Sequence, residues 1–293
     1  MKKSRIFGLS FVSLLLLFSL TNISNAAPPA YVGIKTGDSF NWVGTADMAN
    51  VNSSAISLIG ADNWTLTYNM LNEMIENETG LQIGSLLAGA ARVNVKNITD
   101  EMPFYPFTGV GVYAEILVSY EPGLWMNLTD GSYPSMVILN PAGLNASNYH
   151  YLMEASLFLP KGIDFSQLAT WINANVSSID PGILPLYNNL TVSALADGLK
   201  VTVLGDFFEW LLVNMSAPFP IPTIGDVELQ VKWNENGVFS FAQLTYGGLA
   251  LVTAQLIPGS GEIPGFVMPI FLGASAIALV GAISIIRRKK RII

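Results

Sequence analysis

Few residues of this chain could carry out acid–base or nucleophilic chemistry. The chain has no cysteine and one histidine, His150. Thiol catalysis and Cys/His zinc sites are therefore excluded, and a Ser-His-Asp triad would have to use His150. No Gly-x-Ser-x-Gly sequence is present to supply the serine of such a triad. We interpret His150, which lies between two tyrosines, as a surface or hydrogen-bonded residue, and we predict no catalytic residue, no cofactor and no metal site.

Two carboxylate pairs are the remaining candidates for catalysis. Asp226 with Glu228, and Asp206 with Glu209, have spacings that a glycosidase or a calcium site could use. Carboxylates with the same spacing on the solvent-exposed face of a strand would equally serve to keep the protein soluble. Residues 109–114 match the G-x-G-x-x-A dinucleotide fingerprint, but they open a β-patterned run instead of a strand-to-helix junction. We interpret that match as chance.

Nine Asn-x-Ser/Thr triplets form a larger set of candidate sites. This triplet is the acceptor for N-glycosylation, so nine of them favour a glycosylated surface protein in a host that has this modification. We expect most of them to lie on turns or strand ends. The candidate residues are Asn52, Asn63, Asn77, Asn97, Asn127, Asn145, Asn175, Asn189 and Asn214.

An uncharged apolar run, residues 266–286, predicts a transmembrane helix. At about 1.5 Å per residue, it would span roughly 31 Å, which is close to the hydrocarbon thickness of a bilayer. A basic tail, residues 287–293, follows the run and would stay in the cytoplasm, which leaves the preceding domain outside the cell. A stripe of small residues in the helix would permit a weak homodimer. The residues that set this topology are Arg287, Arg288, Lys289, Lys290 and Arg291.

The first 26 residues have the pattern of a signal peptide. Three basic residues precede an apolar stretch at residues 6–20, and small residues follow at Ser24 and Ala26. We predict cleavage after Ala26 and therefore secretion to the plasma membrane. The alternative is an uncleaved membrane helix.

The region between these two segments is strongly acidic. It holds six of the 14 basic residues and all 21 acidic residues, a balance of −15. Such a charge repels phosphate backbones, so we expect no nucleic-acid partner. The partners that we expect are membrane lipid and either surface glycans, envelope proteins or an apolar ligand. We expect an extracellular domain over residues 27–258, as one unit or two, and a short tether over residues 259–265.

Alternating apolar and polar residues predict that this domain is mainly β (α+β), with a curved antiparallel sheet and about two packed helices. Trp64, Tyr68, Leu71 and Ile75 are spaced for one side of a helix over residues 62–78. Asp164 can cap a second helix. The expected strands are 38–43, 91–96, 110–120, 136–139, 151–159, 191–195 and 199–204, followed by a meander of 227–233, 238–246 and 249–256.

The segment Pro264-Gly265-Phe266, followed by an apolar run and a basic tail, resembles the PGF-type sorting signals of archaeal surface proteins, which an archaeosortase processes. The resemblance implies cleavage near Pro264 and replacement of the helix by a lipid. Retention of the helix is the alternative.

Three further segments, residues 31–38, 159–165 and 233–238, are similar to archaeal exported proteins of the choice-of-anchor families, which have no assigned activity. The hairpin at Trp233–Gly237 also resembles lipoprotein carriers of the LolA type, and this implies a curved sheet that forms an apolar cavity. The hypotheses are therefore a membrane-anchored surface protein with a binding or structural role, a carrier of lipid or another apolar ligand, and a surface hydrolase.

Overall fold

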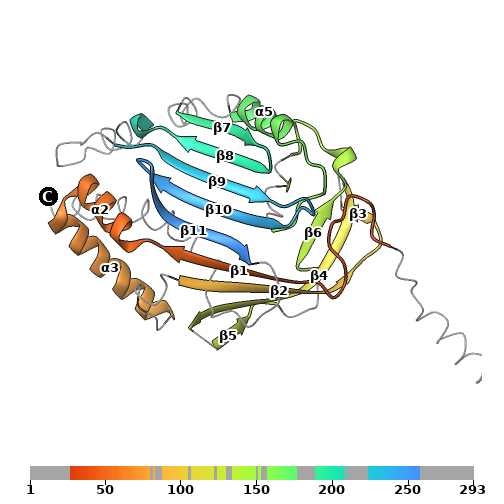
Figure 1. Ribbon diagram of the computed structural model, residues 1–293, viewed down its shortest axis with the longest axis horizontal. Coiled ribbons are helices and arrows are strands. Elements are labelled where there is room, and N and C mark those ends of the chain that lie inside the picture. The colour runs from red at the N-terminus through yellow and green to blue at the C-terminus, as the bar shows by residue number, and fades with distance from the viewer. Residues whose placement is uncertain are drawn as a thin grey trace, which may run out of the picture.

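The structure is a computed structural model that describes residues 27–257, except 80–81, 83–87, 105–106, 122–123, 130–133, 150, 153–156, 177–188, 208 and 210–223. The described residues form one 11-stranded antiparallel sheet, with the order β3-β4-β2-β1-β11-β10-β9-β8-β7, while β5 and β6 also pair with β4. Figure 1 shows α2 and α3 at one end of the sheet and α5 beside β7. The expected mainly β, antiparallel fold class is confirmed.

The elements follow one another along the chain with few helices between the strands. The strands are β1 (Ser39–Ala46), β2 (Ala88–Ile98), β3 (Met102–Phe104), β4 (Phe107–Glu121), β5 (Leu124–Asn127), β6 (Met136–Leu139), β7 (Leu190–Leu195), β8 (Gly198–Val203), β9 (Val227–Trp233), β10 (Phe239–Tyr246) and β11 (Leu249–Ile257). The helices are α2 (Met48–Ile59), α3 (Ala61–Thr79), the short 3-10 helix η2 (Pro141–Gly143) and α5 (Phe165–Val176).

β1 and β11, the first and last strands along the described chain, are neighbours in the sheet. β1 pairs with β11 from Asn41 opposite Ile257 to Ala46 opposite Val252. On its other side β1 pairs with β2. This pairing joins the strands β1 to β6 to the strands β7 to β11 in one ladder.

The core lies on one face of the sheet, because strand pairing places alternate apolar residues side by side. Trp42 lies opposite Ala91, and Ala91 lies opposite Val118; all three are at most 3% exposed. The buried indole of Trp42 donates a 2.7 Å hydrogen bond to the carbonyl oxygen of Phe239. The opposite face carries charged pairs such as Lys96 with Glu115.

The hairpins near the end of the domain are where the sequence predicts them. Ala196 and Asp197 form the turn between β7 and β8, with Gly198 as the first residue of β8, and residues 234–237 form the turn between β9 and β10. Gly237 has a φ of 71°, and an added Cβ would lie 2.0 Å from the carbonyl oxygen of Leu159. Only glycine fits this position, which explains why the second turn is so clear in the sequence.

The helix expected over residues 62–78 is confirmed as α3, but it contacts α2 more than it contacts the sheet. The indole of Trp64 donates a 3.0 Å hydrogen bond to Oδ1 of Asn52 in α2. We did not predict α2, although its N-cap is a recognisable signal: Asp47 accepts a 3.0 Å hydrogen bond from the backbone N–H of Asn50. The second expected helix, α5, is capped by Asp164 as predicted.

The strand expected over residues 151–159 is wrong. Tyr151 and Leu152 are helical, and the N–H of Leu152 donates to the carbonyl oxygen of Tyr149 at 2.9 Å. Phe158 makes only an isolated bridge to Val238. Leu152 and Phe158 are both buried, so the apolar content of the segment reflects burial without a continuous β ladder.

The signal peptide, the tether and the transmembrane helix predicted above lie outside the described residues. In the described part of the chain, no helix is both long enough and apolar enough to cross a membrane.

The outer edge of β7 is capped at Val192 by one side chain of α5. Asn173 Nδ2 donates to the carbonyl oxygen of Val192 at 2.7 Å, and its Oδ1 accepts from the N–H of Val192 at 3.0 Å. The amide therefore replaces the two hydrogen bonds that another strand would make at this residue.

The hydroxyl of Tyr31 is buried near the Glu101 carboxylate and makes no hydrogen bond of normal geometry to a described residue. Burial, and to a smaller extent the nearby Glu101 carboxylate, raise the pKa of Tyr31 to about 12. Thr108 and Asn140 donate to Glu101 Oε1 at 2.8 Å and 2.7 Å, and these bonds hold the pKa of Glu101 below its usual value.

Replacement of Asn173 by alanine removes the cap and leaves the backbone groups of Val192 without partners. We expect Asn173→Ala to lower the free energy of unfolding by about 1–3 kcal/mol. Gln167→Ala is the control, because Gln167 is exposed on the same helix, and we expect it to change stability by less than about 0.5 kcal/mol. Urea titration followed by tryptophan fluorescence measures both; equal effects of the two variants would contradict the role of Asn173.

Tyr31 makes a separate contribution to stability at high pH. The pKa of Tyr31 is higher in the folded state than in the unfolded state, so the folded chain binds this proton more tightly. The resulting contribution to the free energy of unfolding is complete below pH 10 and is lost as the pH rises from 10 to 12. We expect Tyr31→Phe to be neutral or stabilising at pH 7, since no hydrogen bond is lost. Between pH 10 and 12, unfolding free energies of the variant should fall less steeply than those of the wild type. Parallel curves would show that Tyr31 does not titrate in this way.

Candidate functional site

A small pocket lies at one end of the sheet, where three segments distant in sequence meet. These are the loop that precedes α5, the β7–β8 turn and the β9–β10 turn. The pocket has a volume of about 280 Å³, and we call it the Trp233 pocket. It is lined by Leu159, Pro160, Gly162, Ile163, Phe165, Ala196, Asp197, Trp233, Asn234, Glu235 and Gly237.

Stacked aromatic rings form the floor of the Trp233 pocket. The rings of Phe165 and Trp233 are 5.7 Å apart at an interplanar angle of 18°. Trp233 is only 4% exposed, and its ring also contacts Phe239 edge-on at 6.4 Å. Phe165 comes from the first residue of α5, so the docking of this helix brings the two rings together. Such stacks give flat, apolar surfaces that suit rings or aliphatic chains.

Backbone hydrogen bonds fix the three segments around the aromatic floor. The N–H of Leu159 donates to the carbonyl oxygen of Gly237 at 2.8 Å, and the N–H of Trp233 donates to that of Asp197 at 2.8 Å. Within the β9–β10 turn, Oδ1 of Asn234 accepts from the N–H groups of Asn236 and Val238, both at 3.0 Å. Since these bonds hold the backbone, the pocket is formed without a ligand.

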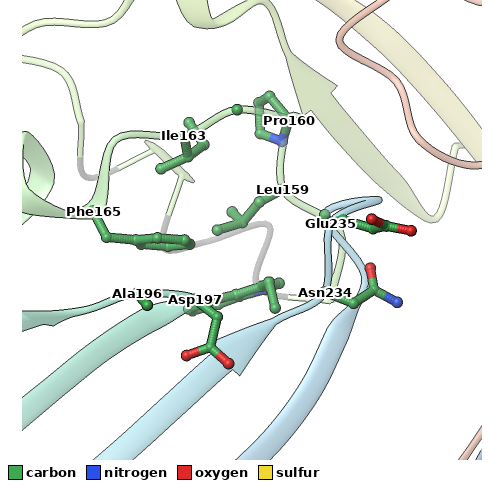
Figure 2. A pocket seen from close by; sticks show the side chains of 11 residues that line it. Leu159, Pro160, Ile163, Phe165, Ala196, Asp197, Asn234 and Glu235 are labelled. Carbon is green, nitrogen blue, oxygen red and sulfur yellow. The ribbon is translucent and has the colours of Figure 1, made fainter.

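Polar and apolar groups contribute almost equally to the exposed lining of the pocket. Figure 2 shows that the polar ends of Asp197, Asn234 and Glu235 point away from the gap between Leu159 and Phe165. The carboxylate of Asp197 forms an ion pair with Lys232 at 3.1 Å. The pocket therefore offers an aromatic surface beside polar groups, and its two carboxylates, Asp197 and Glu235, do not point toward the space between Leu159 and Phe165. The arrangement suits binding more than catalysis.

The volume limits what the pocket can hold. Pockets for small molecules usually measure about 300–1,000 Å³, so 280 Å³ lies just below this range. One ring or a short aliphatic chain fits such a volume, whereas a complete two-chain lipid does not.

The residues that the sequence suggests for catalysis are not brought together. His150 lies outside the described residues. The carboxylate of Asp226 accepts a 2.9 Å hydrogen bond from the N–H of Gly205, while Glu228 pairs with Lys200. Each carboxylate thus has its own structural partner. Among the described residues, no group of three or more His, Cys, Asp or Glu side chains could hold a metal ion.

The second carboxylate pair and the glycine motif have structural explanations as well. Glu209 accepts a 2.9 Å hydrogen bond from the N–H of Ile224. The glycine motif at residues 109–114 lies inside β4, where Gly109 and Gly111 pair with β6. No helix follows these glycines, so they do not form a dinucleotide-binding turn.

The structure describes eight of the nine glycosylation candidates, and Asn214 lies outside it. Four are in helices, against our expectation for most of them: Asn52 in α2, Asn63 and Asn77 in α3, and Asn175 in α5. The other four are on strand ends or turns: Asn97, Asn127, Asn145 and Asn189. The candidate sorting residues, Pro264, Gly265 and Phe266, and the basic residues from Arg287 to Arg291 also lie outside the described part.

Two of these triplets fold back on themselves. Oδ1 of Asn127 accepts from the hydroxyl of Thr129 at 3.0 Å, and Oδ1 of Asn145 accepts from the hydroxyl of Ser147 at 2.6 Å. In contrast, Nδ2 of Asn63 donates to the carbonyl oxygen of Ile59 at 2.8 Å within the helix. The triplets at Asn127 and Asn145 therefore present their amide groups differently from the one at Asn63.

Sequence reasoning did not find the Trp233 pocket. The β9–β10 turn and the first residues of α5 are both recognisable, but nothing local indicates that Phe165 stacks on a residue 68 positions later. A comparison of this chain with models of protein families gives no match, and a comparison with curated protein sequences gives none either.

Proposed function

We propose that this chain is a membrane-anchored protein of the cell surface with a binding role, and that the Trp233 pocket is its binding site. The observation that carries the binding role is the preformed aromatic floor of Phe165 and Trp233 inside a pocket of mixed polar and apolar lining. The anchoring rests on the apolar run at residues 266–286 and the basic residues that follow it. The ligand is a small apolar group that carries a ring or a short aliphatic chain.

A carrier of lipid or another apolar ligand is the second candidate. It is supported by the single apolar face of the sheet, which runs through Trp42, Ala91 and Val118 across neighbouring strands. The small pocket volume favours the binding of one ring or one short aliphatic chain over the binding of a complete lipid. Co-purified lipid in the native protein would favour the carrier over a surface-binding role.

Phe165→Ala tests the binding site. The probe is 4-(dimethylamino)benzonitrile, an uncharged fluorescent dye with a single ring, titrated into the full-length chain in detergent. We expect saturable binding to the wild type and up to about tenfold weaker binding to Phe165→Ala, because one aromatic contact is worth about 0.5–1.5 kcal/mol beyond the area it buries.

The matched control for this experiment is Phe104→Ala. Phe104 is also a half-buried phenylalanine, but it lies in β3 and does not line the pocket. Dye affinity should stay at the wild-type value in this variant. If both variants weaken binding equally, or if neither does, the dye does not occupy the Trp233 pocket and the proposed site is wrong.

A further inference from the structure

A row of apolar side chains is exposed on β5 and on Leu128, the residue that directly follows it, at the border of the sheet. Leu124, Met126 and Leu128 are 66%, 52% and 55% exposed; we call them the β5 row. They alternate along the strand, so they point to one side. Met126 lies opposite Val118, which belongs to the buried face. The β5 row is thus the solvent-exposed continuation of the apolar core face.

The register of the sheet places the β5 row near the end of β11. Ile257 lies opposite Asn41, Asn41 opposite Arg92, Arg92 opposite Leu117, and Leu117 opposite Asn127. Four strand spacings separate Ile257 from Asn127, which is about 19 Å along the sheet. In Figure 1, β5 lies next to β4, beyond β2 on the side away from β11.

The chain after Ile257 leads directly to the proposed anchor. Nine residue steps separate Ile257 from Phe266, the first residue of the apolar run. Even fully extended, they reach only about 30 Å. The bilayer surface must therefore lie within about 30 Å of the end of β11. The β5 row lies about 19 Å from that end along the sheet, so the bilayer can reach it.

We propose that the β5 row contacts the lipid bilayer in which the chain is anchored. Leucine and methionine side chains transfer favourably from water into hydrocarbon. The opposite side of β5 supports the same orientation, because Trp125 lies there with the guanidinium of Arg92 4.8 Å above its ring. Tryptophan and arginine are residues that favour the membrane–water interface. The inference rests on the proposed anchoring.

This contact would also orient the Trp233 pocket. Trp233 lies opposite Phe239 at the start of β10, and β10 is the neighbour of β11. The pocket and the end of β11 are therefore at the same end of the sheet. At the other end, α2 follows β1, and the N–H of Asp47 donates to the carbonyl oxygen of Leu251 near the start of β11. With the β5 row on the bilayer, the pocket lies on the membrane side and α2 on the distal side.

Lipid-borne quenching tests the contact, and the absence of native cysteines makes the labelling specific. The full-length Leu124→Cys chain is labelled with bimane and reconstituted into phosphatidylcholine vesicles, with or without a lipid that carries a nitroxide on its acyl chain. Leu66→Cys is the matched control: Leu66 is 62% exposed, close to the 66% of Leu124, but it lies in α3 at the distal end. We expect the nitroxide lipid to reduce the fluorescence of the label at position 124 and to leave the label at position 66 unchanged.

A second pair of positions guards against a local effect of the label. Met126→Cys and Ile56→Cys have exposures of 52% and 43% in the native chain, and Ile56 lies in α2 at the distal end, so they should repeat the difference. No quenching at positions 124 and 126, or equal quenching at the control positions, overturns the proposal. A disulfide-linked dimer of Leu124→Cys without lipid quenching also overturns it, because a second copy then covers the β5 row.

Vesicle flotation separates this outcome from a failure of the anchoring. If the labelled chain does not float with the vesicles, both the anchoring and the bilayer contact fail. If it floats and the label at position 124 is not quenched, only the contact fails.

Discussion

The pairing of β1 with β11 is the constraint on which the rest of the structure depends. These strands come from opposite ends of the described chain, and each has only one other neighbour in the sheet. Without this ladder, β1 to β6 and β7 to β11 would be two smaller sheets, each with an additional open edge. The pairing also aligns Trp42 with Leu256, which makes the two apolar faces one surface. The hydrogen bond from the Trp42 indole to Phe239, one strand beyond β11, fixes the relation between the halves.

The Trp233 pocket follows from the way in which the sheet ends. The β7–β8 and β9–β10 turns lie at the same end of the sheet. The segment before α5 is held against them by the hydrogen bond from the N–H of Leu159 to the carbonyl oxygen of Gly237. The glycine in the turn is what allows this close approach. The helix α5 then contributes Phe165 to the pocket and Asn173 to the edge of β7. One helix thus completes both the binding surface and the border of the sheet.

The sequence predicts those parts of the fold whose signals are local. The segment Ala196-Asp197-Gly198 and the Asn234–Gly237 turn mark hairpins by their residue types, and Asp164 specifies the start of α5. The segment around Leu152 and Phe158 misleads because burial by distant residues gives the same apolar content as a strand. The Trp233 pocket cannot be predicted in this way, since its walls come from three segments that only the sheet topology brings together.

The amide cap at Val192 has a consequence for the behaviour of the protein in crowded solutions. An uncovered outer strand is a template on which another chain can add by backbone pairing, and this is a common first step toward fibrils and amorphous deposits. Because Asn173 occupies that template only while α5 is docked, detachment of this one helix would suffice to expose it, with the central strands still folded. Protection of this border against intermolecular pairing is thus coupled to the docking of α5, whose Leu168 is part of the core.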